Sequence, residues 1–222
     1  MSTFVFVHGA NAGGWCWYKV AALLEKDGHR VHAVDLPGHG RNAGNRGTMR
    51  DYIAHVVDIL DAEDAPVILV GHSMGGAVIT GVGEARPEKI ARIVYITAFF
   101  GESGESMAGP LADMAGSDGM IPVIDTSDIV YHDCPEDTKA LARFCQTPQA
   151  VEPLVTPIIW TAERWGTIPR TYIGCAFDRV FPIAEQRRRA DLHPGATWIE
   201  LESGHMPLFS MPEKLVNHLE NL

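Results

Sequence analysis

The sequence predicts an α/β fold: a mostly parallel sheet of about six strands, with helices on both faces and a short helical cap. Short runs of aliphatic and β-branched residues alternate with helical patterns, and most runs are apolar throughout, as in strands buried on both faces. One run, at residues 67–70, ends in Gly71-His72-Ser73-Met74-Gly75, the spacing of a sharp strand-to-helix turn. With 222 residues, 46% of them hydrophobic, the chain suffices for one domain with a sizeable core.

The first strand and helix are indicated by local composition. Residues 4–8 form a compact apolar run, and the loop at 9–14 has little side-chain bulk, so its backbone N–H groups can approach a ligand. From Trp15 to Lys26 apolar side chains recur on one side of a helix, and Gly28 follows as a stop signal.

The next elements continue the alternation. A second strand is predicted over residues 30–35, before the turn-forming sequence at 36–41. Thr48, with Asp51 three residues later, resembles a helix N-terminus, and the apolar residues after it recur at i, i+3, i+4 and i+7. This pattern predicts a helix that leads into the strand at 67–70.

The chain after Ser73 contains a break in the pattern. The segment from Ser73 to Arg86 is rich in glycine, yet the turn at Ser73 requires a helix there, so we expect burial to override helix propensity. A strand over residues 91–98 follows. Residues 101–169 then carry prolines, methionines and acidic residues without a strand repeat, which predicts an inserted cap with short helices.

The alternation resumes in the last quarter of the chain. Strands are predicted over residues 171–176 and 197–201, with a helix over 183–192 between them. Ser210 and Glu213 have the spacing of a capping box, which predicts the start of a final helix.

Charge and cysteine usage exclude several classes of partner. The net charge is −10 and the pI about 5.4, so we expect neither a nucleic-acid nor a membrane partner, because both favour clustered Lys and Arg. The basic run at 187–189 is interpreted as a solvated helix face.

The chain enters a strand by about Phe4, without a signal sequence, and its four cysteines are scattered, which predicts a cytoplasmic protein. The histidines lack an H-x-x-x-H pair, so we expect no metal.

Three polar residues follow predicted strands, at the sheet edge where parallel α/β proteins place their sites. Ser73 follows the third strand, Asp178 the fifth and His205 the sixth. A serine hydroxyl needs a base within hydrogen-bond reach, and that base needs a carboxylate to fix its tautomer. The sequence therefore predicts that Ser73, Asp178 and His205 are catalytic, in that chain order.

Each of these three catalytic assignments has an alternative interpretation. A Gly-x-Ser-x-Gly match alone is compatible with a turn without chemistry, and a histidine after a strand with a capping residue. Glu102, after the fourth strand, is a rival acid. We favour Asp178 because Glu102 lies in an acidic stretch typical of a solvated loop.

The turn and the first loop also offer donors for an oxyanion. The turn presents the backbone N–H of Met74, and the first loop presents that of Ala10, so both are candidates for an oxyanion hole. The neighbouring His8 and His72 are interpreted as structural residues that orient these loops.

These motifs together resemble the plant methylesterase and hydroxynitrile lyase family of α/β-hydrolases and its bacterial esterase relatives. The resemblance lies in residues 4–10, 14–19, 71–76, 87–90, 170–173 and 204–206. It implies a single α/β-hydrolase domain over residues 1–222 with a cap insertion at about 101–169. It also implies an enzyme without a cofactor that acts on small, largely apolar esters. In the cap, where the resemblance weakens, Trp160 and Trp165 are candidate walls of the substrate pocket, or else only its core.

The resemblance also distinguishes an esterase from a lyase. In the lyases of this family a lysine follows the catalytic histidine and a threonine stands in the first loop; here these positions are Met206 and Gly9, which we assign to the substrate site. The prediction is a serine hydrolase that cleaves a small-molecule ester through an acyl-enzyme. A carbon–carbon lyase and a slow-turnover receptor are the alternatives, and a homodimer is left open.

Overall fold

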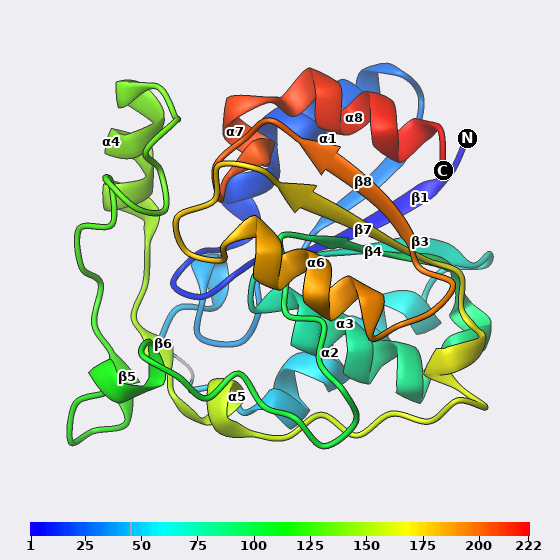
Figure 1. Cartoon of the computed structure of the whole chain (residues 1–222), viewed down its shortest axis with the longest axis horizontal. Coiled ribbons are helices and arrows are strands. Elements are labelled where there is room, and N and C mark those ends of the chain that lie inside the picture. The colour runs from blue at the N-terminus through cyan, green and yellow to red at the C-terminus, as the bar shows by residue number, and fades with distance from the viewer. Residues whose placement is uncertain (45) are drawn as a thin grey trace.

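The computed structural model describes residues 1–44 and 46–222. Within them, a six-stranded parallel sheet with the order β2-β1-β3-β4-β7-β8 lies between two layers of helices (Figure 1). The predicted α/β fold, a parallel sheet of about six strands with helices on both faces, is thereby confirmed. The strands are β1 (Thr3–Val7), β2 (Arg30–Ala33), β3 (Val67–His72), β4 (Ile90–Ile96), β7 (Arg170–Cys175) and β8 (Thr197–Leu201).

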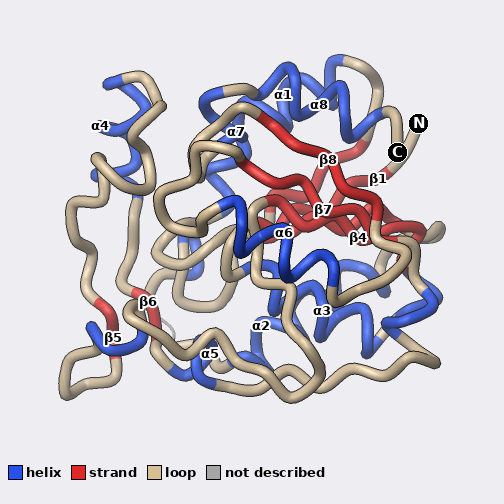
Figure 2. The backbone as a smooth tube through the Cα atoms, viewed as in Figure 1, coloured by secondary structure: helices blue, strands red, loops and turns tan. Residues whose placement is uncertain are grey.

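The helices cover the sheet on both faces, as Figure 2 shows with the strands in red between them. One face carries α1 (Tyr18–Lys26) and α8 (Pro212–Glu220), and the other carries α2 (Met49–Asp61), α3 (Gly75–Ala85) and α6 (Ile183–Asp191). Short 3₁₀ turns lie at Gly14–Trp17, Gly40–Asn42, Pro87–Lys89, Ala112–Met114 and Trp165–Thr167. No helix among the described residues has both the length and the apolar composition to cross a membrane.

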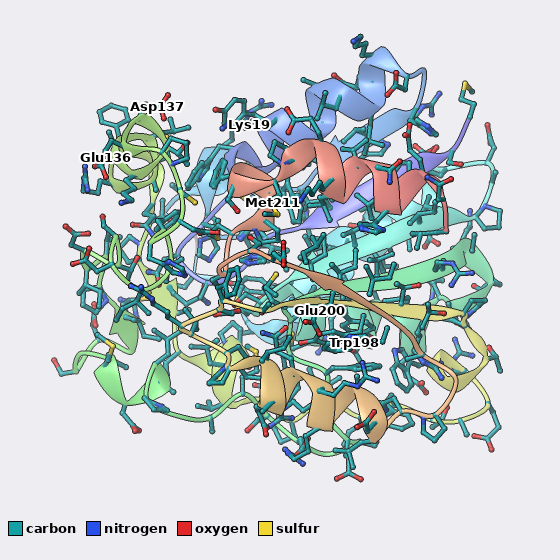
Figure 3. The ribbon with its side chains drawn as sticks, turned by 45° about the horizontal axis from the view of Figure 1, so that its top comes forward. Lys19, Glu136, Asp137, Trp198, Glu200 and Met211 are labelled. Carbon is teal, nitrogen blue, oxygen red and sulfur yellow. The ribbon has the colours of Figure 1, made fainter. Side chains whose placement is uncertain are left out.

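Two hydrophobic cores lie on opposite faces of the sheet, and β1 contributes to both. Val5 and Val7 pack in the core beneath α2 and α3, whereas Phe4 and Phe6 pack in the core beneath α1 and α8. Alternate residues of a strand point to opposite faces, so an apolar run of this kind requires a cover on each side. Trp198 of β8 lies beside α6 (Figure 3), where the guanidinium of Arg187 stacks over its ring at 4.7 Å.

Of the two helix N-termini predicted from capping boxes, the first is confirmed and the second is wrong. Thr48 and Asp51 form the capping box of α2: the Thr48 hydroxyl accepts from the Asp51 N–H at 3.2 Å, and the Asp51 carboxylate accepts from the Thr48 N–H at 2.9 Å. Ser210 instead ends a separate short helix, α7 (Pro207–Ser210), and α8 begins after Met211 without a side-chain cap. The Ser210 hydroxyl is engaged by that of Ser203 at 2.7 Å, so it does not reach the α8 terminus.

The chain between β4 and β7 carries short elements. They are α4 (Glu136–Cys145), α5 (Glu152–Val155) and an antiparallel pair, β5 (Met120–Ile121) with β6 (Gln149–Ala150), which the sequence pattern did not indicate. Figure 1 shows α4 at the outer edge of the molecule. Its residues Glu136 and Asp137 lie well away from Trp198 and Glu200 of β8 (Figure 3).

Candidate active site

Ser73 lies between the end of β3 and the start of α3, with a φ of 52°. Residues other than glycine rarely adopt this left-handed conformation, which is typical of a strained functional turn. A Cβ on Gly71 would lie 2.7 Å from the carbonyl oxygen of Gly75, and a Cβ on Gly75 would lie 2.6 Å from that of Val7. Side chains at either glycine would therefore push the turn open.

His205 and Asp178 meet in the buried space at the ends of β8 and β7. The imidazole Nδ1 of His205 lies 2.7 Å from Oδ2 of Asp178, and both residues are less than 8% exposed. A carboxylate only accepts, so Nδ1 carries the proton and Nε2 is left as the basic nitrogen. The structure thus brings together two of the three predicted catalytic residues in direct contact.

The Asp178 carboxylate is held by four donors. Its Oδ1 accepts from the N–H groups of Val180 at 2.7 Å and Phe181 at 2.9 Å, and its Oδ2 accepts from both His205 and the Thr97 hydroxyl. Burial by itself raises the pKa of Asp178, but His205 and these donors together hold the pKa below its usual value. The carboxylate therefore stays ionised.

Thr97 is a site residue that the sequence pattern did not reveal. It directly follows β4, it is 1% exposed, and its φ of 36° is strained for a β-branched residue. Its only signal is a hydroxyl at the end of an apolar strand, which resembles ordinary strand composition. The fourth strand end thus supplies a donor to Asp178, whereas its acidic residue Glu102 is exposed and its N–H bonds to Glu105 at 2.8 Å.

Two further buried histidines, His72 and His8, form hydrogen bonds with backbone groups of the loops near Ser73. His72 donates from Nε2 to the carbonyl oxygen of His205 at 2.8 Å, and His8 donates from Nδ1 to that of Gly9 at 2.8 Å while its Nε2 accepts from the Leu36 N–H. Burial, with the nearby histidines, lowers the pKa of each ring to about 3. Both rings are therefore neutral, which suits orienting roles.

Ser73 and His205 line one cavity of about 350 Å³. Ala10 and Met74 line it as well, and neither backbone N–H donates a hydrogen bond to another residue that the structure describes. Both donors are thus available to a ligand. The rest of the lining is mostly apolar and comprises Thr97, Ala98, Phe99, Ser106, Met107, Ala108, Gly109, Pro110, Leu111, Leu154, Val180, Phe181 and Arg189.

A family model described as "Alpha/beta hydrolase family" matches residues 4–218. The chain belongs to this family. Among curated relatives, this hydrolase is 31% identical to Methylesterase 2 of Arabidopsis thaliana, over 97% of the chain and 94% of that protein, and 32% identical to Methylesterase 7 of the same plant, over 96% and 92%. The predicted resemblance to plant methylesterases is confirmed.

Solved structures agree with this assignment. A pyrethroid hydrolase from Sphingobium faniae superposes with a TM-score of 0.85 at 30% identity, covering 99% of this chain and 96% of that one. Polyneuridine aldehyde esterase superposes with a TM-score of 0.86 at 26% identity, covering 100% and 98%. Tomato Methylketone Synthase I, solved with 2-tridecanone, reaches 0.87 at 25% identity, covering 99% and 96%.

The structure of this alpha/beta hydrolase places the predicted substrate-binding residues elsewhere. Trp165 is 1% exposed and packs against Trp160, with ring centres 4.2 Å apart, and its indole Nε1–H donates to the hydroxyl of Tyr95. Met206 is 2% exposed in the core beneath α1 and α8. Neither tryptophan nor Met206 is among the described residues that line the cavity.

Gly9 packs against Ser73 and His72, and it is also absent from the described cavity lining. A Cβ there would lie 2.9 Å from the Cβ of Ser73 and 3.1 Å from Nδ1 of His72. A threonine at this position would therefore displace Ser73 or the first loop, so the glycine serves packing against the turn.

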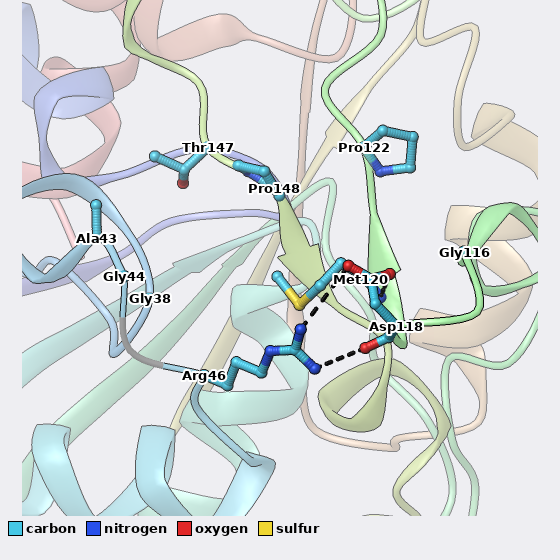
Figure 4. Close-up of a pocket in the computed structure, with 10 residues that line it drawn as sticks. All are labelled: Gly38, Ala43, Gly44, Arg46, Gly116, Asp118, Met120, Pro122, Thr147 and Pro148. Carbon is cyan, nitrogen blue, oxygen red and sulfur yellow. Dashed lines mark hydrogen bonds and ion pairs between the residues drawn. The ribbon is translucent and has the colours of Figure 1, made fainter.

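A second cavity, of about 510 Å³, has Arg46 and Asp118 among the residues that line it (Figure 4). Arg46 donates to the Asp118 carbonyl oxygen at 2.6 Å and pairs with its carboxylate at 3.8 Å. None of the three predicted catalytic residues lines it. Within residues 1–44 and 46–222, no group of three His, Cys, Asp or Glu side chains is placed to hold a metal ion.

Proposed function

We propose that this chain is a serine hydrolase that cleaves small, largely apolar carboxylic esters through an acyl-enzyme. The observation that carries the proposal is the buried contact of His205 with Asp178 beside a cavity that Ser73 also lines. The names of the relatives, methylesterase and polyneuridine aldehyde esterase, support an ester substrate.

The proposed reaction has two halves. In the first, Ser73 Oγ attacks the ester carbonyl carbon while Nε2 of His205 takes its proton, and the oxyanion accepts from the N–H groups of Ala10 and Met74. The intermediate then expels the alcohol, which receives the proton from His205. In the second half, water attacks the acyl-enzyme by the same route, releasing the acid and regenerating Ser73.

Asp178 supports this cycle electrostatically. Its carboxylate keeps the proton on Nδ1 and stabilises the imidazolium that forms when Nε2 is protonated. Because four donors hold Asp178, the imidazole is oriented before a substrate arrives.

The apolar lining of the cavity favours esters over cyanohydrins. Cyanide leaving into such a cavity needs a positive charge nearby, because an unpaired buried anion costs several kcal/mol. Met206 follows His205 and is buried in the core. Arg189 also lines the cavity, but Glu105 and Glu185 already neutralise its charge.

The test compares p-nitrophenyl acetate and mandelonitrile with one enzyme preparation, correcting the latter for spontaneous decomposition. We expect ester turnover to exceed cyanide release. Cyanide release that is faster than ester turnover, and that is lost in Ser73→Ala, would identify a lyase. Stoichiometric binding of esters without release of product would identify a receptor.

A further inference from the structure

Arg189 is the one arginine or lysine among the described residues that line the cavity beside Ser73. It lies in the last turn of α6, and its side chain is 17% exposed. Its guanidinium carbon is 5.3 Å from the ring centre of Phe99 and 5.9 Å from that of Phe181, and both rings line the same cavity. Arg189 therefore forms part of the cavity wall, with its guanidinium next to two aromatic residues that line the same cavity.

Two carboxylates hold this guanidinium without using all of its donors. Nη1 donates to Glu105 at 3.2 Å and Nε donates to Glu185 at 2.9 Å. An arginine carries five N–H donors, and Nη2 has no hydrogen-bond partner among the residues that the structure describes. A donor beside an apolar wall is satisfied by water or by a ligand.

The charges around Arg189 favour a neutral ligand atom over an anion. Glu185 also binds Arg188 at 2.7 Å, so two arginines and two glutamates balance one another. A carboxylate at Nη2 would add negative charge beside Glu105, in a protein whose net charge is already −10. A carbonyl or ether oxygen accepts the same N–H without this repulsion.

We propose that Arg189 donates a hydrogen bond to a neutral oxygen of the substrate, a carbonyl or an ether, remote from the scissile ester. The proposal rests on ester hydrolysis at Ser73 and narrows the substrate class to largely apolar esters with one such acceptor. Small-molecule sites typically combine apolar walls with a few polar groups that fix orientation. Arg189 is then a specificity-determining residue.

The experiment compares isosteric esters in pairs. In one series of p-nitrophenyl alkanoates, a methylene at successive positions of the acyl chain is replaced by an ether oxygen or a ketone. A second series places the same oxygens in the alcohol half of esters of one fixed acid. For each pair we measure the ratio of kcat/KM, oxygen-bearing over hydrocarbon, in the wild type and in Arg189→Met. Comparing the two enzymes cancels the intrinsic reactivity of each ester.

We expect at least one position to give a wild-type ratio about tenfold above that of Arg189→Met, as for a hydrogen bond to a charged donor. Glu105→Gln is the matched control: it removes one ion-pair partner but keeps the guanidinium, so the ratio should persist. Arg189→Lys should retain part of the ratio. Circular dichroism and thermal unfolding establish that the variants are folded.

Three results would overturn the inference while leaving ester hydrolysis intact. One is that no position in either series shows a preference in the wild type. Another is that the preference survives in Arg189→Met. The third is that a half-ester with a terminal carboxylate is preferred over every neutral oxygen. By contrast, the absence of Ser73-dependent turnover for all of these esters would overturn the proposed function itself.

Discussion

Asp178 has four hydrogen-bond donors on its two carboxylate oxygens, so its orientation is fixed before a substrate binds. The donors come from the loop after β7, from His205, and from Thr97 at the end of β4. Two of them are backbone N–H groups, which do not depend on side-chain identity. At the scale of single residues, the proposed mechanism therefore depends on Asp178 keeping His205 in one tautomer.

Replacing the carboxylate by its amide tests this role. We expect Asp178→Asn to lower kcat by about 10⁴-fold with little change in thermal stability, because the amide favours the wrong tautomer of the imidazole. Glu102→Gln is the matched control at the preceding strand end, and we expect it to have little effect because Glu102 is exposed. Equal losses in the two variants, or a larger loss in Glu102→Gln, would show that Asp178 is not the acid.

Ser73, Asp178 and His205 could be found from the sequence, but Thr97 and Arg189, which also contribute to the site, could not. Ser73 and His205 each follow a glycine pattern that interrupts an apolar run, which is visible in the chain. Thr97 and Arg189 carry no such mark: a threonine suits a strand, and an arginine suits a solvated helix face. Their roles depend on which segments fold against them, and local composition does not encode this.

At the scale of elements, the chain between β4 and β7 contacts the loops that carry the site. The Asp133 carboxylate accepts from the Gly204 N–H at 2.6 Å, and His132 donates from Nε2 to the carbonyl oxygen of Phe177 at 2.9 Å. These two bonds reach the residues just before His205 and Asp178. A Cβ on Gly204 would lie 2.6 Å from both Asp133 and His132, so glycine permits this approach.

The Asp133 contact yields a prediction about catalysis. We expect Asp133→Ala to lower kcat about tenfold, because the loop of His205 loses a charge-assisted hydrogen bond, with a smaller change in KM. Asp133→Asn keeps an acceptor and should restore most of the activity. A proton NMR signal of the His205–Asp178 hydrogen bond should weaken in the alanine variant alone. An unchanged kcat and an unchanged signal would show that Asp133 only covers the surface.

The elements of the sheet and its covering helices were predictable, because their apolar runs and helical periodicity are local. The chain between β4 and β7 was not, since its short elements pack by contacts distant in sequence. Trp160 and Trp165 illustrate this: an aromatic pair in an irregular segment suits a pocket wall or a core equally well. Here Trp165 packs against Phe100 and bonds to Tyr95 instead.

At the scale of the whole molecule, the fold buries several neutral histidines. Burial lowers the pKa of His39 to about 4, and those of His8 and His72 to about 3, from an ordinary value of 6.5. The unfolded chain therefore binds more protons than the folded one below pH 6.5. The stability is fully present above this pH and is lost as the pH falls toward the folded values.

This linkage predicts a decline in the free energy of unfolding from pH 7 to pH 4.5. Below pH 6.5, each of the three histidines lowers the free energy of unfolding by about 1.4 kcal/mol per pH unit, until the pH reaches the pKa of that histidine in the folded chain. Urea unfolding at several pH values measures the slope. His39→Gln, which keeps polar atoms for Thr147 and Tyr52, should flatten it. A free energy of unfolding that is constant over this range would show that these rings bind protons in the folded chain as readily as in the unfolded chain.

The most direct measurement is intact-mass labelling by a serine-directed phosphonate together with ester turnover, in the wild type and in Ser73→Ala. We predict one adduct on the wild-type chain, located at Ser73, and, in the folded alanine variant, no adduct and a loss of up to ~10⁶-fold in kcat. Labelling, or turnover at the wild-type rate, that persists in Ser73→Ala would contradict this prediction, because the nucleophile would then lie elsewhere.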